Sequence, residues 1–94
     1  MASVFSKAFP AAVKEIRVHF SPQGAQSAGA RQFVLSHFKT IKASNPKLPF
    51  LVREAQNTPA RMFVRLERGL EKKAELDGLE ASAIEKKLTE LLSN

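Results

Sequence analysis

The chain has 94 residues, of which 44% are hydrophobic, and this size and composition predict one small globular domain rather than a disordered chain. It contains no cysteine, which excludes disulfides, iron–sulfur ligation and thiol chemistry. The formal net charge of +6 favours acidic partners, a class that includes acidic protein surfaces, RNA and anionic lipid.

The positive charge is concentrated in the first two thirds of the chain. Residues 1–66 carry ten basic side chains against two acidic ones, whereas residues 67–94 carry five basic and seven acidic ones. No apolar run approaches the roughly 18 residues that a membrane span requires. The sequence therefore predicts a domain with a basic body and no transmembrane segment.

The N-terminal segment, residues 1–12, contains no acidic residue and carries Ser3, Ser6 and Lys7 among small and apolar side chains. This composition is typical of a mitochondrial targeting segment. Because the segment is short and lacks arginine, an uncleaved signal fits it better than a removed presequence. An ordinary N-terminal turn fits equally well, and the sequence leaves both interpretations open. The folded domain is predicted to occupy residues 13–94.

The first half of that domain is predicted to form a strand, a helix and a second strand. Residues 13–21 place Ile16, Val18 and Phe20 on one face, which is the period of a half-buried strand. Residues 28–43 repeat apolar side chains at helical spacing, and the helix ends before Pro46. Residues 50–54 form a short, mostly apolar run typical of a strand. Such a βαβ unit has a right-handed crossover in nearly all proteins, so the helix should cover one face of the sheet.

The second half is predicted to form two further strands and a helix. Residues 61–67 alternate apolar and polar side chains, and a turn at residues 68–69 leads to a fourth strand over residues 70–76. The Lys and Glu content of this strand predicts a place at the sheet edge, where charges are tolerated. After a turn at residues 77–78, helical spacing resumes at residue 81. Ser82 and Glu85, three residues apart, match a capping box, and a helix that starts two residues earlier, with Glu80 near its N-terminus, is the alternative.

The predicted order is therefore β-α-β-β-β-α, an α/β fold in which two helices cover one face of a four-stranded mixed sheet. The other face of the sheet is left open. The alternation of side chains places a set of cations and one aromatic ring on it: Arg17, His19, Arg53, Arg61, Phe63 and Arg65. Arginine and aromatic residues are enriched in protein interfaces, and arginine pairs well with carboxylate or phosphate. The sequence predicts that this face is a docking surface for another protein.

No residue pattern matches a catalytic, metal or nucleotide site. His19 and His37 are the only histidines, whereas metal catalysis needs at least three convergent ligands. Gly24 and Gly29 form neither a GxGxxG motif nor a P-loop. His19 is interpreted as a polar residue of the open face, and His37 as a residue at the border of the helix's apolar stripe. The chain is predicted to be a non-enzyme without cofactor or metal.

RNA binding is the main alternative to protein docking, because basic groups surround a ring that could stack on a base. RNA-binding sheets usually present two or three such rings, however, and Phe63 is the only aromatic residue predicted on this face. Protein docking is therefore favoured over nucleic-acid binding.

Three segments resemble a known family: IRVHF at residues 16–20, GARQF at residues 29–33 and, most specifically, NPKLPFLVRE at residues 45–54. The family is that of small thioredoxin-fold accessory subunits of mitochondrial NADH:ubiquinone oxidoreductase, or respiratory complex I. It shares its domain with two mitochondrial ribosomal proteins, and the resemblance covers residues 14–92. It implies a structural or assembly role in the matrix arm of complex I, on the matrix side of the inner membrane, in contact with other subunits. A mitochondrial ribosomal protein that binds rRNA through the same basic face is the alternative.

The resemblance also implies the roles of three individual residues. Thioredoxin-like folds carry a cis proline before the third strand of this core, and Pro59 stands at that place. Some members of the family carry two cysteines, whose positions are held here by Ser21 and Ala55. Neither residue can form a disulfide, so a thiol switch is excluded for this chain.

Overall fold

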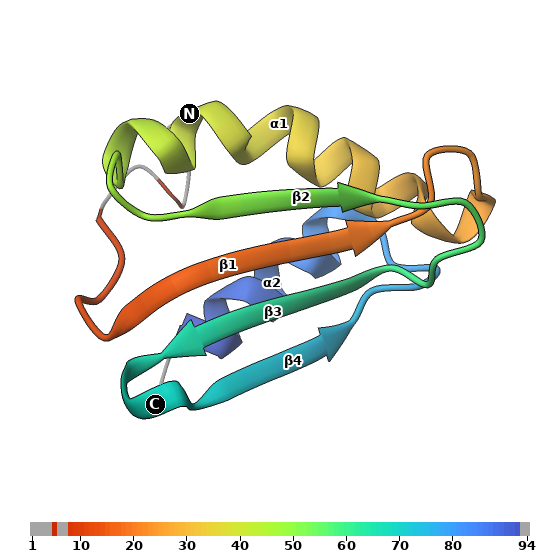
Figure 1. The fold of residues 1–94 in the computed structure, drawn as a ribbon. Helices are drawn as coiled ribbons and strands as arrows, with labels where there is room; N and C mark the ends of the chain where they lie inside the picture. The colour runs from red at the N-terminus through yellow and green to blue at the C-terminus, as the bar shows by residue number, and fades with distance from the viewer. Residues whose placement is uncertain (1–4, 6–7, 93–94) are drawn as a thin grey trace.

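The computed structural model describes Phe5 and residues 8–92. All six predicted elements are present, and the bounds of the first five agree with the prediction to within one residue. They follow in the order β1 (Val13–Phe20), α1 (Ala28–Ser44), β2 (Phe50–Glu54), β3 (Arg61–Leu66), β4 (Glu71–Glu75) and α2 (Ala81–Leu92), as Figure 1 shows. Two short 3-10 turns, η1 (Ala25–Ser27) and η2 (Glu67–Gly69), precede α1 and β4.

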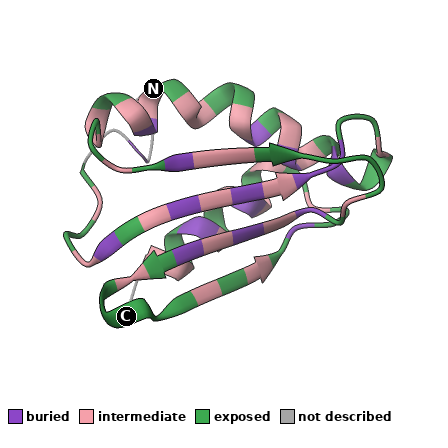
Figure 2. Cartoon of the chain, in the orientation of Figure 1, coloured by how far each residue is buried: buried purple, intermediate pink, exposed green. Residues whose placement is uncertain are grey.

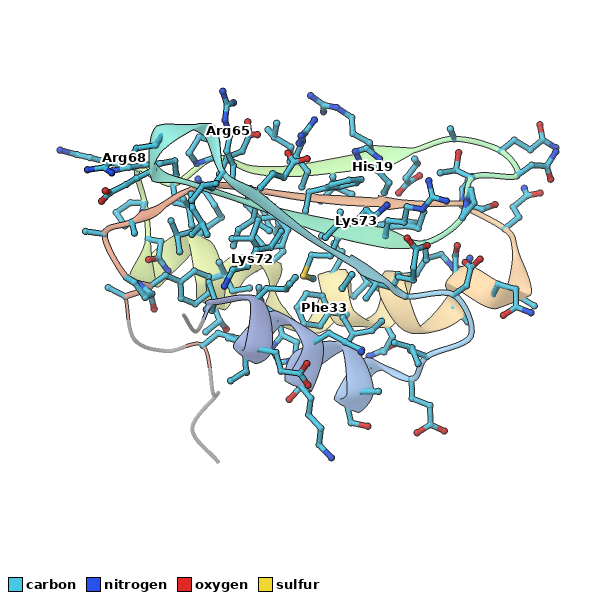
Figure 3. The ribbon with its side chains drawn as sticks, turned by 90° about the horizontal axis from the view of Figure 1, so that it is seen from below. His19, Phe33, Arg65, Arg68, Lys72 and Lys73 are labelled. Carbon is cyan, nitrogen blue, oxygen red and sulfur yellow. The ribbon has the colours of Figure 1, made fainter. Side chains whose placement is uncertain are left out.

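The four strands form one mixed sheet in the order β2-β1-β3-β4. β1 pairs with β2 in parallel through the α1 crossover, and the other two pairs are antiparallel. β4 is an edge strand, as its charged sequence predicted. Both helices lie against the same face of the sheet, which Figure 3 shows from the side. The predicted α/β architecture is confirmed, and within the described residues no helix is long and apolar enough to cross a membrane.

The core lies between the sheet and the two helices. Ile16 and Val18 of β1 and Met62 and Val64 of β3 are fully buried, and they alternate with partly exposed residues along each strand (Figure 2). The helices complete the core with Ala30, Phe33, Ile41, Ile84 and Leu88, all of which are fully buried. Period-two burial on the strands leaves every second strand residue on the opposite face.

The N-terminal segment takes part in this core. Phe5 is 2% exposed, and its ring lies edge-on to Phe9, Phe33 and His37, with centroid distances of 6.0, 6.0 and 5.1 Å. Residues 1–12 thus contribute two aromatic rings to the packing of residues 13–94. Ser3, Ser6 and Lys7, on which the targeting prediction depends, lie outside the described residues, and that prediction stays a prediction.

A polar contact joins the two helices, and it involves a residue of the predicted capping box. The Nε2 of His37 on α1 lies 2.9 Å from the Oε2 of Glu85 on α2. α2 begins at Ala81, and the N–H of Ile84 donates to the carbonyl of Glu80 at 3.0 Å, so Ser82 lies inside the helix and not at its cap. The capping-box prediction was wrong because the helix starts before Ser82, and Glu85 instead contacts a residue 48 positions away.

Gly29 sets how closely α1 approaches the segment before α2. A Cβ built on Gly29 would overlap the backbone carbonyl of Leu79. That carbonyl belongs to a segment fixed by its own hydrogen bonds, from Leu79 N–H to the Leu76 carbonyl at 3.0 Å and from Gly78 N–H to the Gln26 carbonyl at 2.9 Å. Only glycine allows this contact between two backbones.

The peptide bond before Pro59 is trans, because no cis peptide bond occurs within the part of the chain that the structure describes. The prediction of a cis peptide bond at Pro59 is therefore wrong. The loop is closed in another way: Asn57 has φ 64°, Thr58 N–H donates to the Ala55 carbonyl at 3.1 Å, and Ala60 N–H donates to Asp77 Oδ1 at 2.7 Å. The trans isomer is the lower-energy form of a prolyl bond and fits between these contacts.

Ser21 and Ala55 lie at the carboxyl ends of the neighbouring strands β1 and β2. Ser21 is buried, and its Oγ accepts a hydrogen bond from the N–H of Gly24 at 3.1 Å. Ala55 is exposed, and its N–H donates to the carbonyl of Phe20 at 3.1 Å. The hydroxyl of Ser21 therefore stabilises the turn that leads into α1.

Candidate docking face of the sheet

The six residues predicted for docking lie together on the sheet face that the helices leave open. The strand register pairs His19 on β1 with Arg53 on β2 and with Arg61 on β3, and it pairs Arg17 with Phe63. Arg65 follows two residues after Phe63 on the same face. Figure 3 shows His19 and Arg65 on the side away from the helices, whereas Phe33 lies between the helices and the sheet. The structure therefore brings all six into one surface.

Five further residues belong to this surface and were not part of the predicted set. They come from β1, β2 and β4, and they complete what we call the open sheet face: Glu15, Arg17, His19, Leu51, Arg53, Arg61, Phe63, Arg65, Glu71, Lys73 and Glu75. The alternation of β4 alone was enough to place its three charged residues on one side. Which side they face depends on the pairing with β3, a contact that local patterns do not reveal.

Arg17 is held within the protein at the centre of this face. Its guanidinium lies 2.8 Å from Glu71 and 3.4 Å from Glu15, and its Cζ lies 5.3 Å from the centroid of the Phe63 ring. The ring face attracts the cation, and the two carboxylates engage its Nε and one terminal nitrogen. Arg17 therefore joins β1, β3 and β4 and has two anionic partners within the protein.

The outer arginines are less satisfied. Arg61 pairs with Glu75 through its Nε at 3.0 Å, and Arg65 lies 3.9 Å from Glu15, with side chains 42% and 56% exposed. Arg53 is exposed and has no ion-pair or hydrogen-bond partner within residues 8–92 or Phe5. Exposed ion pairs stabilise a fold by about 1 kcal/mol at most. These three guanidinium groups are therefore available to an incoming acidic group.

His19 lies between these cations on the open sheet face. Its ring centroid lies 4.9 Å from that of Phe63. Partial burial and the neighbouring charges of Arg17, Arg53 and Arg61 lower the pKa of His19 below the usual 6.5. Among the described residues no group of three His, Cys, Asp or Glu side chains is arranged to hold a metal ion. The chemistry of the face is that of ion pairing and aromatic contact.

The lowered pKa of His19 predicts a pH dependence of stability. Because the unfolded chain binds a proton to this histidine at higher pH than the folded chain does, stability should fall as pH drops below about 6.5. Replacing His19 with Gln should remove this part of the dependence. Urea unfolding of both proteins between pH 5 and 7 measures the difference, and parallel curves for the two would contradict the assignment.

Comparison with known proteins connects this chain to mitochondrial proteins. Residues 30–81 match the family described as the mitochondrial ribosomal protein L51 / S25 / CI-B8 domain. The chain is 37% identical over 87 residues to the NADH-ubiquinone oxidoreductase 10.5 kDa subunit of Neurospora crassa, covering 93% of each chain. It is 37% and 31% identical to the NADH dehydrogenase [ubiquinone] 1 alpha subcomplex subunit 2 of Arabidopsis thaliana and of Mus musculus. These alignments cover 87% and 86% of this chain, and 84% and 82% of the two relatives.

Proposed function

This chain belongs to the mitochondrial ribosomal protein L51 / S25 / CI-B8 domain family, and from that premise we propose that it is an accessory subunit of mitochondrial respiratory complex I. The proposal depends on one observation above all. The relatives that match along most of the chain carry the names of complex I subunits, and one of them aligns over 93% of both chains. The family also includes ribosomal proteins, and the names of these relatives favour complex I over the ribosome.

The role we propose is structural and not catalytic. The carboxylates of the open sheet face, which would be the candidates for acid–base chemistry, each lie within ion-pair distance of a cation. The guanidinium groups engage carboxylate oxygens that acid–base chemistry would need. Electron carriers would then be bound by other subunits.

The open sheet face is the surface through which we propose that the chain docks. It presents three available guanidinium groups around a partly exposed phenylalanine, and a face of this chemistry fits an acidic surface on a larger protein. We place that partner among the matrix-arm subunits of complex I, with this chain on the matrix side of the inner membrane. The chain would be one member of a hetero-oligomer and would need no nucleic acid.

Replacing Arg61 and Arg65 together with glutamine should release the chain from complex I. Glutamine is preferable to glutamate here, because reversed charges would face Glu75 and Glu15 across the sheet and would disturb the fold itself. Tagged wild-type chain should comigrate with NADH dehydrogenase activity on a native gel of solubilised mitochondrial membranes. The double variant should lose most of that comigration.

The matched control replaces Lys39 and Lys86, which are exposed on the two helices, with glutamine. It removes the same charge from the opposite side of the molecule and should leave the chain in the complex. The free energy of unfolding of both variants should lie within about 1 kcal/mol of the wild-type value, because the changed groups are exposed. Comigration of wild type with a ribosomal particle would contradict the proposed function, and retention of the arginine variant would contradict the proposed face.

A further inference from the structure

Three cationic or polar side chains form a row across the open sheet face, at one end of the sheet. His19 on β1 has Arg53 beside it on β2 and Arg61 beside it on β3. Neighbouring strands lie about 4.8 Å apart, so the two arginines start about 10 Å from each other with the imidazole between them. Their long side chains can reach a group of carboxylate size above His19.

The positive charge of this row is the least compensated on the face. Arg17, one row further along, has Glu15 and Glu71 as partners. Arg61 has only Glu75, which takes its Nε and leaves the terminal nitrogens unpaired within the described residues. Arg53 has no partner there, and it is exposed to solvent on the edge strand β2.

We propose that the row of Arg53, His19 and Arg61 binds a carboxylate of a protein partner. An aspartate or glutamate side chain would sit over the imidazole and accept hydrogen bonds from the two guanidinium groups. Phe63, which contacts His19 and Arg17, would pack against the methylene groups of that side chain. Guanidinium groups suit a carboxylate because their planar N–H groups match its two oxygens.

Binding at this row would be coupled to a proton. The charged groups that face His19 are Arg17 on its own strand, Arg53 on β2 and Arg61 on β3, while the helices pack on the other side of the sheet. All three are positive, and with burial they lower the pKa of His19. A bound carboxylate offsets their charge and raises that pKa, so the complex takes up a proton and binding strengthens as pH falls.

The test is an NMR titration of the His19 ring in the full chain, with and without a hexaglutamate peptide. We expect the pKa of His19 to rise by about half a unit to one unit on saturation, and a hexaglutamine peptide to leave it unchanged. Replacing Arg53 with Gln should weaken hexaglutamate binding about tenfold, whereas replacing the exposed Lys39 of α1 with Gln should leave it unchanged. Amide spectra of both variants report whether the fold is kept.

Two outcomes would overturn the assignment. One is hexaglutamate binding that leaves the His19 ring unchanged or is insensitive to the Arg53 substitution. The other is tighter binding of an octauridine strand at the same row, which would make the row a phosphate site. The identity of the partner rests on the proposed function, but the titration needs no assembled complex. A chain that binds the peptide here and never enters complex I would contradict the proposed function alone.

Discussion

Replacing Phe33 with alanine is expected to destabilise the protein by about 3–5 kcal/mol, the largest effect of any single substitution that we propose. Phe33 is fully buried on α1, and its ring lies 6.0 Å from that of Phe5 and 5.0 Å from that of His37. Truncation removes one of the rings that join the N-terminal segment to α1 and leaves a cavity beside Phe5 and His37. A domain of this size has about 5–14 kcal/mol of stability, so a large share would be lost.

Leu35 provides the matched control, because it lies on the same helix and is 80% exposed. Its replacement with alanine should change the free energy of unfolding by no more than about 0.5 kcal/mol. Urea unfolding followed by circular dichroism measures both variants. Equal stabilities for the two would show that the packing around Phe33 differs from the structure described.

Replacing Gly29 with alanine should destabilise the protein by about 2 kcal/mol, although helix propensity alone predicts the opposite. Alanine is favoured over glycine inside a helix by about 1 kcal/mol. The added methyl group, however, would overlap the carbonyl of Leu79, whose backbone is held by hydrogen bonds on both sides. Forcing a group into packed backbone costs about 3 kcal/mol at the upper end of the usual range, which exceeds the gain in propensity.

The control for this substitution is Ala43, which is exposed on the same helix. Its replacement with glycine should cost about 1 kcal/mol, as propensity predicts when no packing changes. Thermal unfolding of both variants separates the contribution of helix propensity from that of the overlap with Leu79. A Gly29→Ala protein more stable than wild type would mean that the segment around Leu79 moves away without cost.

The strands and helices of this fold were predictable because their patterns are local. Ile16, Val18 and Phe20 alternate with polar residues, and α1 repeats its apolar residues at helical spacing, so each element shows which face it buries. The errors came from contacts between distant parts of the chain. Glu85 matches a capping box in sequence but reaches His37 in space. The burial of Phe5 was not predictable in this way, because Phe5 belongs to no strand or helix with a repeating apolar pattern.

The candidate site shows the same division. Alternation along β1 and β3 was sufficient to place Arg17, His19, Arg61 and Phe63 on one face. It did not show that Glu71 would lie against Arg17, because the register between β3 and β4 is set by a turn in which Arg68 and Gly69 both have positive φ. The sequence pattern did not distinguish the arginines of this face, but the structure does. Arg17 has ion-pair partners within the protein, and Arg53 has none among the described residues.

The burial of Phe5 constrains how a mature form of this chain could be produced. A processing protease that cut after Phe9 would remove two rings from the helical layer and leave Phe33 and His37 facing an empty space. Losing one buried phenylalanine costs about 3–5 kcal/mol, which a small domain tolerates poorly. A cut at this position should therefore destabilise the domain. If residues 1–12 do direct import, the targeting signal and part of the core packing belong to the same short segment.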